Sequence, residues 1–229
     1  RFYNPRYDQR VSNEWKYNLS YGKIDLETHV VRNAQGNALK TPIDIDYSRE
    51  NCQIWDTKWH GAGIPPVISL DENGEPTFLH VLSEDNLKSH RYYYVRRKKG
   101  KWKQTPICDS NHQWNSSYLA RDKEGILHAY VIVGKCYLGG GYMNRHGGGC
   151  IEEWISQDKG NSWKKTRDLM LNSKPYRGWR YNKIQPVVRP DGRIVDGMLL
   201  FYGWKDQNTP EAKAFLLHEE VGFDPIRDK

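Results

Sequence analysis

The sequence predicts an all-β protein that is assembled from repeated strand units. No stretch of the 229 residues shows a helical period of useful length, whereas short apolar segments bounded by Asp and Gly recur along the chain. A pattern that begins at Val31 also returns at Val95, 64 residues later. Self-similarity of this length indicates the blades of a β-propeller. We therefore expect four-stranded blades, with about three to four of them in this chain.

The repeat joins residues 31–43 to residues 95–107. Both copies carry Val-Arg, then Gly, then Thr-Pro-Ile, with the same gaps between them. Because Gly adopts positive φ at no steric cost, we interpret Lys99-Gly100 as the turn of an outer hairpin. The basic run Arg96-Arg-Lys-Lys99 then lies at the tip of this hairpin, where a solvated turn is the favoured interpretation.

A second unit reads as strand, Asp/Gly turn, strand. It occurs at residues 66–82, 118–133 and 186–202, with the turns at Asp71, Asp122 and Asp191. The units place blade boundaries along the whole chain. We expect an irregular lead-in at 1–23, a partial blade at 24–59, blades at 60–111 and 112–179, and a partial blade at 180–229.

This number of blades is small for a ring. A closed propeller needs about 4 to 8 blades, and an open stack leaves strand edges exposed. We therefore expect the missing blades to come from an upstream part of the natural protein or from another chain.

The composition of the chain indicates the chemical class of its binding partner. The net charge of +7 favours an acidic partner, and the nine Trp and fifteen Tyr residues suit strands and sugar-facing surfaces. No recognition-module signature or long basic tract indicates nucleic acid, so an anionic polysaccharide is preferred. No apolar run approaches the ~20 residues of a membrane span, and no signal-like segment is present. We expect a secreted or periplasmic protein whose export signal is removed or lies upstream.

The most specific motif is Ser156-Gln-Asp158-Lys-Gly160-Asn-Ser-Trp163. Apolar and polar residues alternate on both sides of it, which predicts two antiparallel strands joined by a tight turn. The Asp carboxylate is expected to cap backbone N–H groups, and Gly160 to take positive φ.

This motif resembles the Asp-box, or BNR repeat, of sialidase-like β-propellers. In that family the box is a structural turn between the two outer strands of a blade. The strand units resemble most closely the branch that contains polysaccharide lyases such as ulvan lyases. That resemblance implies cleavage of a uronate-containing polysaccharide by β-elimination with His, Tyr and Arg residues, no cofactor for the chemistry, and a structural metal (Zn or Ca) in some members.

Candidate site residues come from the segments ahead of the first strand of each blade, which crowd round one mouth of a propeller. His60, His112 and Arg180 each lie six residues before Pro66, Tyr118 and Pro186. We predict that they share one rim. The neighbouring residues predicted to bind sugar or join the chemistry are Trp59, Trp114, Asn115, Trp179 and Tyr181. The alternative is that all of these residues plug the channel and bond locally.

The glycine-rich segment 134–149 is expected to reach the same mouth. It contributes Tyr142 and Arg145 to the predicted catalytic set. A flexible lid without chemistry is the alternative. Cys136 and Cys150 bracket this segment, so they form either a disulfide or, with His146, a weakly supported zinc site.

β-Elimination needs a base, an acid and a cation that neutralises the uronate carboxylate. We predict that His60 or His112 serves with Tyr142 or Tyr181 as the base and acid, and that Arg180 or Arg145 is the cation. Two functions of other classes stay open, a sialidase-like glycoside hydrolase and a non-catalytic carbohydrate-binding propeller. His80 and His128 lie inside apolar second strands and are expected to be satisfied core residues.

Overall fold

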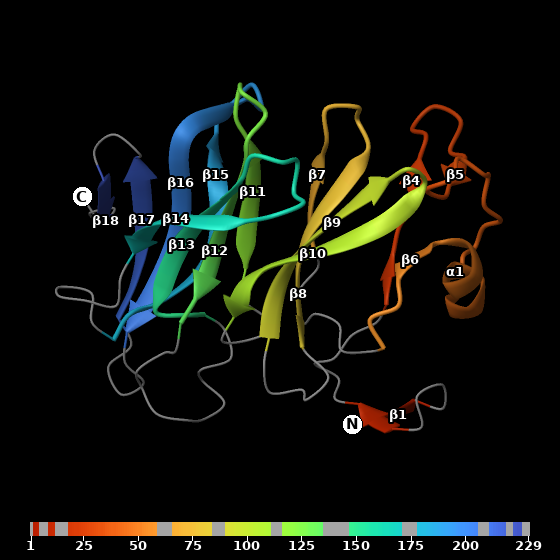
Figure 1. The fold of residues 1–229 in the computed structure, drawn as a ribbon, viewed down its shortest axis with the longest axis horizontal. Coiled ribbons are helices and arrows are strands. Elements are labelled where there is room, and N and C mark those ends of the chain that lie inside the picture. The colour runs from red at the N-terminus through yellow and green to blue at the C-terminus, as the bar shows by residue number, and fades with distance from the viewer. Residues whose placement is uncertain are drawn as a thin grey trace.

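The computed structural model contains three four-stranded antiparallel sheets (Figure 1). It describes residues 2–4, 9–11, 18–58, 66–83, 90–110, 116–134, 147–170, 178–205, 211–218 and 222–225. In each sheet the strands lie side by side in chain order. The first sheet contains β7 (Val67–Leu70), β8 (Pro76–Ser83), β9 (His90–Lys98) and β10 (Lys101–Ser110). The second contains β11 (Ser117–Arg121), β12 (Leu127–Val133), β13 (Cys150–Ser156) and β14 (Lys164–Met170).

The third sheet contains β15 (Arg180–Val188), β16 (Ile194–Lys205), β17 (Glu211–His218) and β18 (Gly222–Pro225). The sequence analysis expected only part of a blade from residue 180. The structure instead has a fourth strand, with Leu216 opposite Asp224 and Phe215 opposite Pro225. Gly, Asp and Pro are uncommon in strands, which explains why this edge strand carries little sequence signal.

The first strands of the three sheets face one another. β11 contacts both β7 and β15, as expected for blades whose first strands surround a common axis. The described residues therefore form an all-β arrangement of three consecutive blade-like sheets, which agrees with the predicted class.

The first 58 residues differ from the expected partial blade. Short strands pair here as β1 (Phe2–Asn4) with β2 (Gln9–Val11), β3 (Leu19–Ser20) with β6 (Gln53–Trp55), and β4 (Lys23–Ile24) with β5 (Val31–Arg32). The helix α1 (Ile45–Asn51) follows Asp44, whose carboxylate accepts a hydrogen bond from the Tyr47 amide at 2.8 Å. This N-cap explains a helix that periodicity alone did not predict. Among the described residues, no helix has the length and apolar character needed to cross a bilayer.

The 64-residue repeat has a structural counterpart in its turns. Gly36 and Gly100 both have positive φ, 86° and 77°. The second copy forms the long β9–β10 hairpin, whereas the first copy forms only β5 and an isolated bridge from Arg32 to Ala38.

Apolar side chains fill the spaces between the sheets. One cluster joins the first and second sheets, and another joins the second and third. A third cluster packs residues 18–58 against the remaining face of the first sheet, through Leu19, Ile54, Phe78 and Val95. The first sheet is thus covered on both faces.

Candidate functional site

The connections between strands divide the sheets into two ends. Consecutive strands are antiparallel, so connections alternate between the ends. At one end, which we call the turn end, lie the short turns near residues 71–75, 99–100, 122–126, 157–163 and 189–193. The opposite end, the long-connection end, holds the starts of β7, β11 and β15 (Figure 1).

Carboxylate caps organise the turn end. Asp71 accepts hydrogen bonds from the amides of Asn73 and Glu75 at 2.8 and 2.9 Å, and Asp122 accepts one from Ile126 at 2.8 Å. Asp191 accepts one from Arg193 at 3.1 Å. The predicted Asp/Gly turns are therefore confirmed, because a side-chain acceptor satisfies the amide groups that the reversal leaves unpaired.

The turn between β13 and β14 is more elaborate. Asp158 Oδ1 accepts hydrogen bonds from the amides of Asn161 and Ser162 at 3.0 and 2.9 Å, and from Ser156 Oγ at 2.7 Å. Ser156 Oγ in turn accepts the Gly160 amide at 2.7 Å. Ser162 Oγ donates to Asp158 Oδ2 at 2.7 Å, and this bond, together with the others to the carboxylate, lowers the pKa of Asp158 strongly. Lys159 and Gly160 have φ of 58° and 80°, as a primed hairpin turn requires. The predicted capping and the positive φ of Gly160 are both present.

This turn also joins the second sheet to the first. The Trp163 ring lies edge-on to Tyr94 of β9, with the centroids 5.5 Å apart. A Cβ added to Gly160 would lie 2.2 Å from the Tyr94 ring, so no larger residue fits without movement. Lys159 pairs with Glu72 at 2.8 Å, and Asn161 Oδ1 accepts a hydrogen bond from Arg96 at 2.8 Å. We call this turn and its contacts the inter-sheet clasp.

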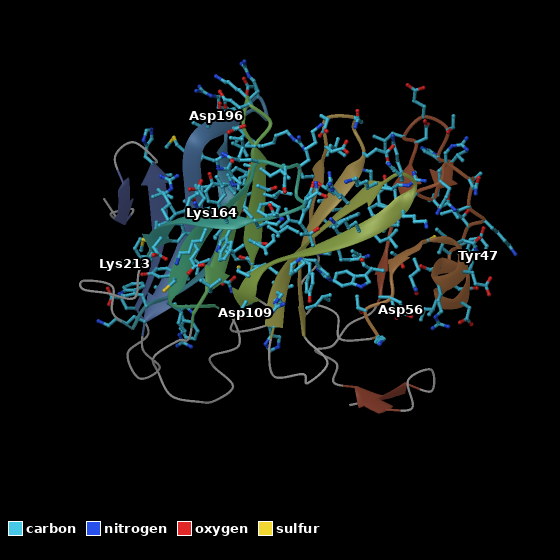
Figure 2. All side chains as sticks on the ribbon, viewed as in Figure 1. Tyr47, Asp56, Asp109, Lys164, Asp196 and Lys213 are labelled. Atoms are coloured by element: carbon cyan, nitrogen blue, oxygen red, sulfur yellow. The ribbon has the colours of Figure 1, made fainter. Side chains whose placement is uncertain are left out.

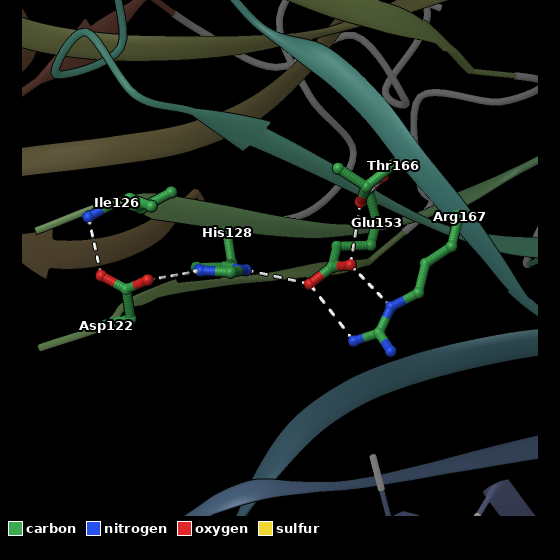
Figure 3. A network of polar contacts seen from close by, with 6 residues as sticks. All are labelled: Asp122, Ile126, His128, Glu153, Thr166 and Arg167. Carbon is green, nitrogen blue, oxygen red and sulfur yellow. Dashed lines mark hydrogen bonds and ion pairs between the residues drawn. The ribbon is translucent and has the colours of Figure 1, made fainter. Parts of the chain in front are cut away.

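A charged network lies on β12, β13 and β14 of the second sheet (Figure 3). His128 Nδ1 lies 2.9 Å from Glu153 Oε1, and His128 Nε2 lies 3.2 Å from Asp122 Oδ2. Arg167 Nε donates to Glu153 Oε2 at 2.7 Å, and Thr166 Oγ1 donates to it at 2.9 Å. The sequence analysis predicted that His128 is satisfied, and this is correct. It did not find the four other members of the network, Asp122, Glu153, Thr166 and Arg167, because their convergence depends on strand register.

The network shifts the pKa values of its members. The hydrogen bond to Glu153 raises the pKa of His128, and the one to Asp122 adds to it against the effect of burial. Burial raises the pKa of Glu153, but hydrogen bonds from His128, Arg167 and Thr166 outweigh it and lower that pKa to about 2. His80, by contrast, is buried without a nearby carboxylate as a cause, and its pKa falls to about 4. Near pH 7 His80 is therefore a neutral core residue. Its buried Nδ1 has no hydrogen-bond partner in the described part of the chain, so the prediction that His80 is satisfied is wrong.

Most of the predicted site residues lie outside the described residues. These are Trp59, His60, His112, Trp114, Asn115, Tyr142 and Arg145, together with Cys136 and His146 of the predicted metal site. Their roles stay predictions. The topology nevertheless fixes the strand ends that they precede, because β7 starts at Val67 and β11 starts at Ser117, both at the long-connection end.

Three predicted site residues, Trp179, Arg180 and Tyr181, are described, and all three are buried. Their exposed fractions are 4%, 0% and 0%. The Arg180 guanidinium lies 3.6 Å from the centre of the Trp204 ring, which is within cation–π distance. Trp179 and Tyr181 are both edge-on to Phe215, at 5.5 and 5.9 Å. In this structure Trp179 is therefore a core residue and presents no open face for a sugar ring.

The burial of Arg180 has a cause in strand register. Arg180 begins β15 and pairs with Trp204, whereas β7 and β11 begin at Val67 and Ser117, beyond the positions of His60 and His112. The pairing of β15 with β16 is irregular at two places: β15 has an extra residue between Asn182 and Gln185, and β16 has extra residues opposite the step from Pro186 to Val188. Arg180 therefore lies in a paired, buried strand and not in a connection ahead of one.

The end of the glycine-rich segment is anchored to β15. Gly148 and Tyr181 form an antiparallel bridge, in which the Tyr181 amide donates to the Gly148 carbonyl at 2.8 Å. A Cβ on Gly147 would lie 2.7 Å from the Tyr181 carbonyl oxygen. Residues 147–149 are buried. Arg145 lies two residues before this anchored part in the chain.

Of the three predicted metal ligands, only Cys150 is among the described residues. Cys150 carries a free thiol in the structure, which is not the disulfide form that the sequence analysis left open. Across the described part of the chain, no group of three or more His, Cys, Asp or Glu side chains is arranged to hold a metal ion. A structural metal thus stays a prediction that concerns Cys136 and His146.

A cavity of about 310 Å³ lies between the first strands and the beginning of β16, from Ile194 to Leu199. The rings of Tyr118 and Tyr130, which line it, stack with their centroids 6.0 Å apart. Burial and the nearby Asp196 carboxylate raise the pKa of Tyr118, so this phenol stays protonated near pH 7. The lining extends along the first strands, from Ile68 and Tyr118, the second residues of β7 and β11, to Arg121 at the end of β11.

The comparisons with known proteins concern the fold. No family model matches the chain, and no curated protein matches its sequence. Among solved structures, an ulvan lyase bound to a GlcA-containing saccharide is similar with a TM-score of 0.59 and 11% identity, over 86% of this chain and 41% of that one. An α-L-arabinanase from Penicillium chrysogenum complexed with arabinobiose is similar with a TM-score of 0.52 and 10% identity, over 82% and 54%.

Both similar proteins are β-propellers, and the chain spans about half of their length or less. At such identities the likeness concerns the fold alone. The three sheets described here therefore have the architecture of consecutive β-propeller blades.

Proposed function

We propose that this chain is part of a carbohydrate-processing propeller, and that the protein is a lyase that cleaves an acidic, uronate-containing polysaccharide by β-elimination. The observation that carries the proposal is the fold likeness to an ulvan lyase over 86% of the chain. The net charge of +7 supports it, because a polyanionic substrate is attracted to a basic protein.

Topology supports a site at the long-connection end. The segments directly before β7 and β11 carry His60 and His112, and these strands start at the same end of their sheets as β15. Arg145 precedes the anchored Gly147 and Gly148 at that same end. The segments that lead to this end thus contain residues that can transfer protons or carry positive charge.

The reaction needs a base, an acid and a fixed cation. The base removes the proton at C5 of the uronate, those electrons form the C4–C5 double bond, and the C4–O bond breaks as the leaving oxygen takes a proton from the acid. Negative charge accumulates on the uronate carboxylate in the transition state, so a preorganised cation lowers the barrier. We assign the base and acid to His60 or His112 with Tyr142, and the cation to Arg145.

The buried residues have a different role in this proposal. Arg180 and Tyr181 have no exposed surface, so we assign them to the support of the site and not to direct contact with substrate. Trp59, Trp114 and Asn115 stay as the proposed substrate-binding set. Because the chain spans 41% of the similar ulvan lyase, we further propose that additional blades complete the ring, and that the protein acts outside the cytoplasm, where such polymers occur.

The test is to mix the protein with ulvan and with glycosaminoglycans and to record ultraviolet absorbance. A lyase produces an unsaturated chain end that absorbs. At least one of the variants His60→Gln and His112→Gln should abolish this signal, whereas His29→Asn, which changes an exposed residue, should leave it intact. New reducing ends without the chromophore would indicate a hydrolase. Retained binding with neither signal would indicate a carbohydrate-binding propeller.

A further inference from the structure

The β9–β10 hairpin carries an unusual arrangement of like charges. In the register of the two strands, Lys98 lies opposite Lys101, and Arg96 lies opposite Lys103. All four residues lie on the sheet face that points toward the second sheet, since Tyr94 and Ile107 on the same face belong to the cluster that joins these sheets. We call these four residues the basic hairpin face. Like charges directly opposite each other destabilise a sheet, so an arrangement of this kind needs a compensating anion.

The described part of the protein does not supply that anion. None of the four residues has a carboxylate within 4.0 Å among the described residues, although Arg97, on the other face, lies 3.9 Å from Glu75. The inter-sheet clasp provides only a neutral acceptor. Asn161 Oδ1 accepts hydrogen bonds from both Arg96 Nη2, at 2.8 Å, and Lys103 Nζ, at 3.1 Å.

Because Arg96 and Lys103 share one amide oxygen, other N–H groups of this surface remain available to a ligand. Arg96 Nε is buried and has no hydrogen-bond partner in the described part of the protein. Lys98, Lys101 and Lys103 are exposed. Their ammonium groups are donors only and carry three N–H each. The surface therefore presents two rows of cations, about 5 Å apart across the strands and about 7 Å apart along them, with unused donors.

We propose that the basic hairpin face binds a segment of acidic polysaccharide at the outer part of the blades, apart from the long-connection end where the chemistry is proposed. The choice of a saccharide among polyanions rests on the proposed function. The side chains near this surface also favour a saccharide. Among the described residues, no aromatic residue of β9, β10 or the clasp is classed as exposed. Single-stranded nucleic acid is held largely by stacking on such rings.

Such a surface holds a polymer while the mouth of the propeller acts on it. Binding at a second place on the same chain raises the effective concentration of substrate at the site. Short saccharides cannot span both places, so the gain is confined to long chains. Attraction between exposed charges is screened by salt, so the binding should weaken steeply as ionic strength rises.

The test is calorimetric titration of the whole chain with dextran sulfate, with neutral dextran as the blank. The variants Lys98→Gln/Lys101→Gln and Arg96→Gln/Lys103→Gln should each bind about tenfold more weakly. The control Lys123→Gln/Lys183→Gln removes the same charge from exposed positions on the second and third sheets and should change affinity by less than about twofold. The Lys98/Lys101 variant should also unfold at the same or a higher temperature than the parent chain, because like-charge repulsion is removed.

Two results would overturn the proposal. One is an equal loss of affinity in the control variant, which would mean attraction by net charge alone. The other is tighter binding of duplex DNA than of dextran sulfate at the same salt concentration. Failure of the lyase proposal is separate: in that case no unsaturated product forms from any uronate substrate, while dextran sulfate binding still depends on the hairpin face.

Discussion

The two ends of the sheets are held by different interactions. At the turn end, carboxylates cap backbone amides, and the clasp fixes the second sheet to Tyr94 of the first. At the long-connection end of the third sheet, contacts between aromatic rings hold the strands together, and Trp179, Tyr181 and Phe201 all pack against Phe215. Figure 2 shows the side chains on both ends of the ribbon. The contrast teaches that an aromatic residue beside a proposed site can belong to the scaffold.

The largest loss of stability is expected at Phe215, which is fully buried and contacts three other rings. Phe215→Ala leaves a cavity in the third sheet and should lower the free energy of unfolding by about 3–5 kcal/mol. Chemical denaturation measures this change. Tyr202→Ala, at a 40% exposed position of β16, is the control and should cost far less. Equal costs for the two variants would show that the aromatic cluster is not the core of this sheet.

The clasp gives the next largest effect. Gly160→Ala places a Cβ 2.2 Å from the Tyr94 ring at a φ of 80° and should lower the free energy of unfolding by about 2–4 kcal/mol. Gly100→Ala is a matched control, because its φ is 77° and nothing lies within 4 Å of the added atom. It should cost only the strain of positive φ, about 1 kcal/mol. If both variants lose the same stability, Gly160 does not touch Tyr94.

The charged network predicts a pH dependence of stability. The lowered pKa of Glu153, about 2 against an ordinary 4.5, gives stability that is present above about pH 4.5 and is lost as pH falls toward 2. The raised pKa of His128 gives stability that is present below 6.5 and is lost as pH rises through the higher folded value. The contribution of the network is therefore largest between these two limits.

Thermal unfolding across pH tests this account. Glu153→Gln removes the negative charge and one of the two acceptor oxygens that His128 and Arg167 use. The variant should therefore lose stability most at pH 5–6 and least at pH 2–3, where the parent carboxylate is itself being protonated. An equal loss of stability at every pH would show that Glu153 contributes through packing alone.

The smallest effect is expected at the exposed ion pair of the clasp. The Lys159 and Glu72 side chains are 66% and 38% exposed, so solvent screens their attraction although their atoms lie 2.8 Å apart. Lys159→Asn keeps a residue that tolerates positive φ and should change the free energy of unfolding by about 0.5 kcal/mol or less. A loss comparable to that of Gly160→Ala would mean that charge, and not ring contact, holds the clasp.

Local patterns predicted the turn end well. The Asp71, Asp122 and Asp191 turns and the 156–163 hairpin depend on short-range bonds between a carboxylate and nearby amides, so their residue types indicate their geometry directly. The α1 helix was missed because one N-cap and a seven-residue length leave no periodic signal. The β18 strand was missed because its Gly, Asp and Pro content obscures an edge strand.

The site was harder to predict because it depends on register. Counting six residues ahead of Pro66, Tyr118 and Pro186 treats the three strands as equal, yet β15 has two irregularities that the others lack in their pairing with the next strand. Arg180 is therefore a buried strand residue. The convergence of Asp122, Glu153 and Arg167 on one network depends likewise on pairing between strands far apart in sequence. The residues before β7 and β11 keep their predicted roles as hypotheses.

The most direct test of the proposed division between scaffold and chemistry is the ultraviolet assay with ulvan, run on the parent protein, His60→Gln, His112→Gln and Gly160→Ala. The account predicts unsaturated product from the parent and from Gly160→Ala below its unfolding temperature. It predicts none from at least one of the variants His112→Gln and His60→Gln, both of which should unfold at the parent temperature. A parent protein that binds ulvan without forming the chromophore would contradict the lyase proposal. Full activity in both His112→Gln and His60→Gln would contradict the placement of the chemistry at the long-connection end.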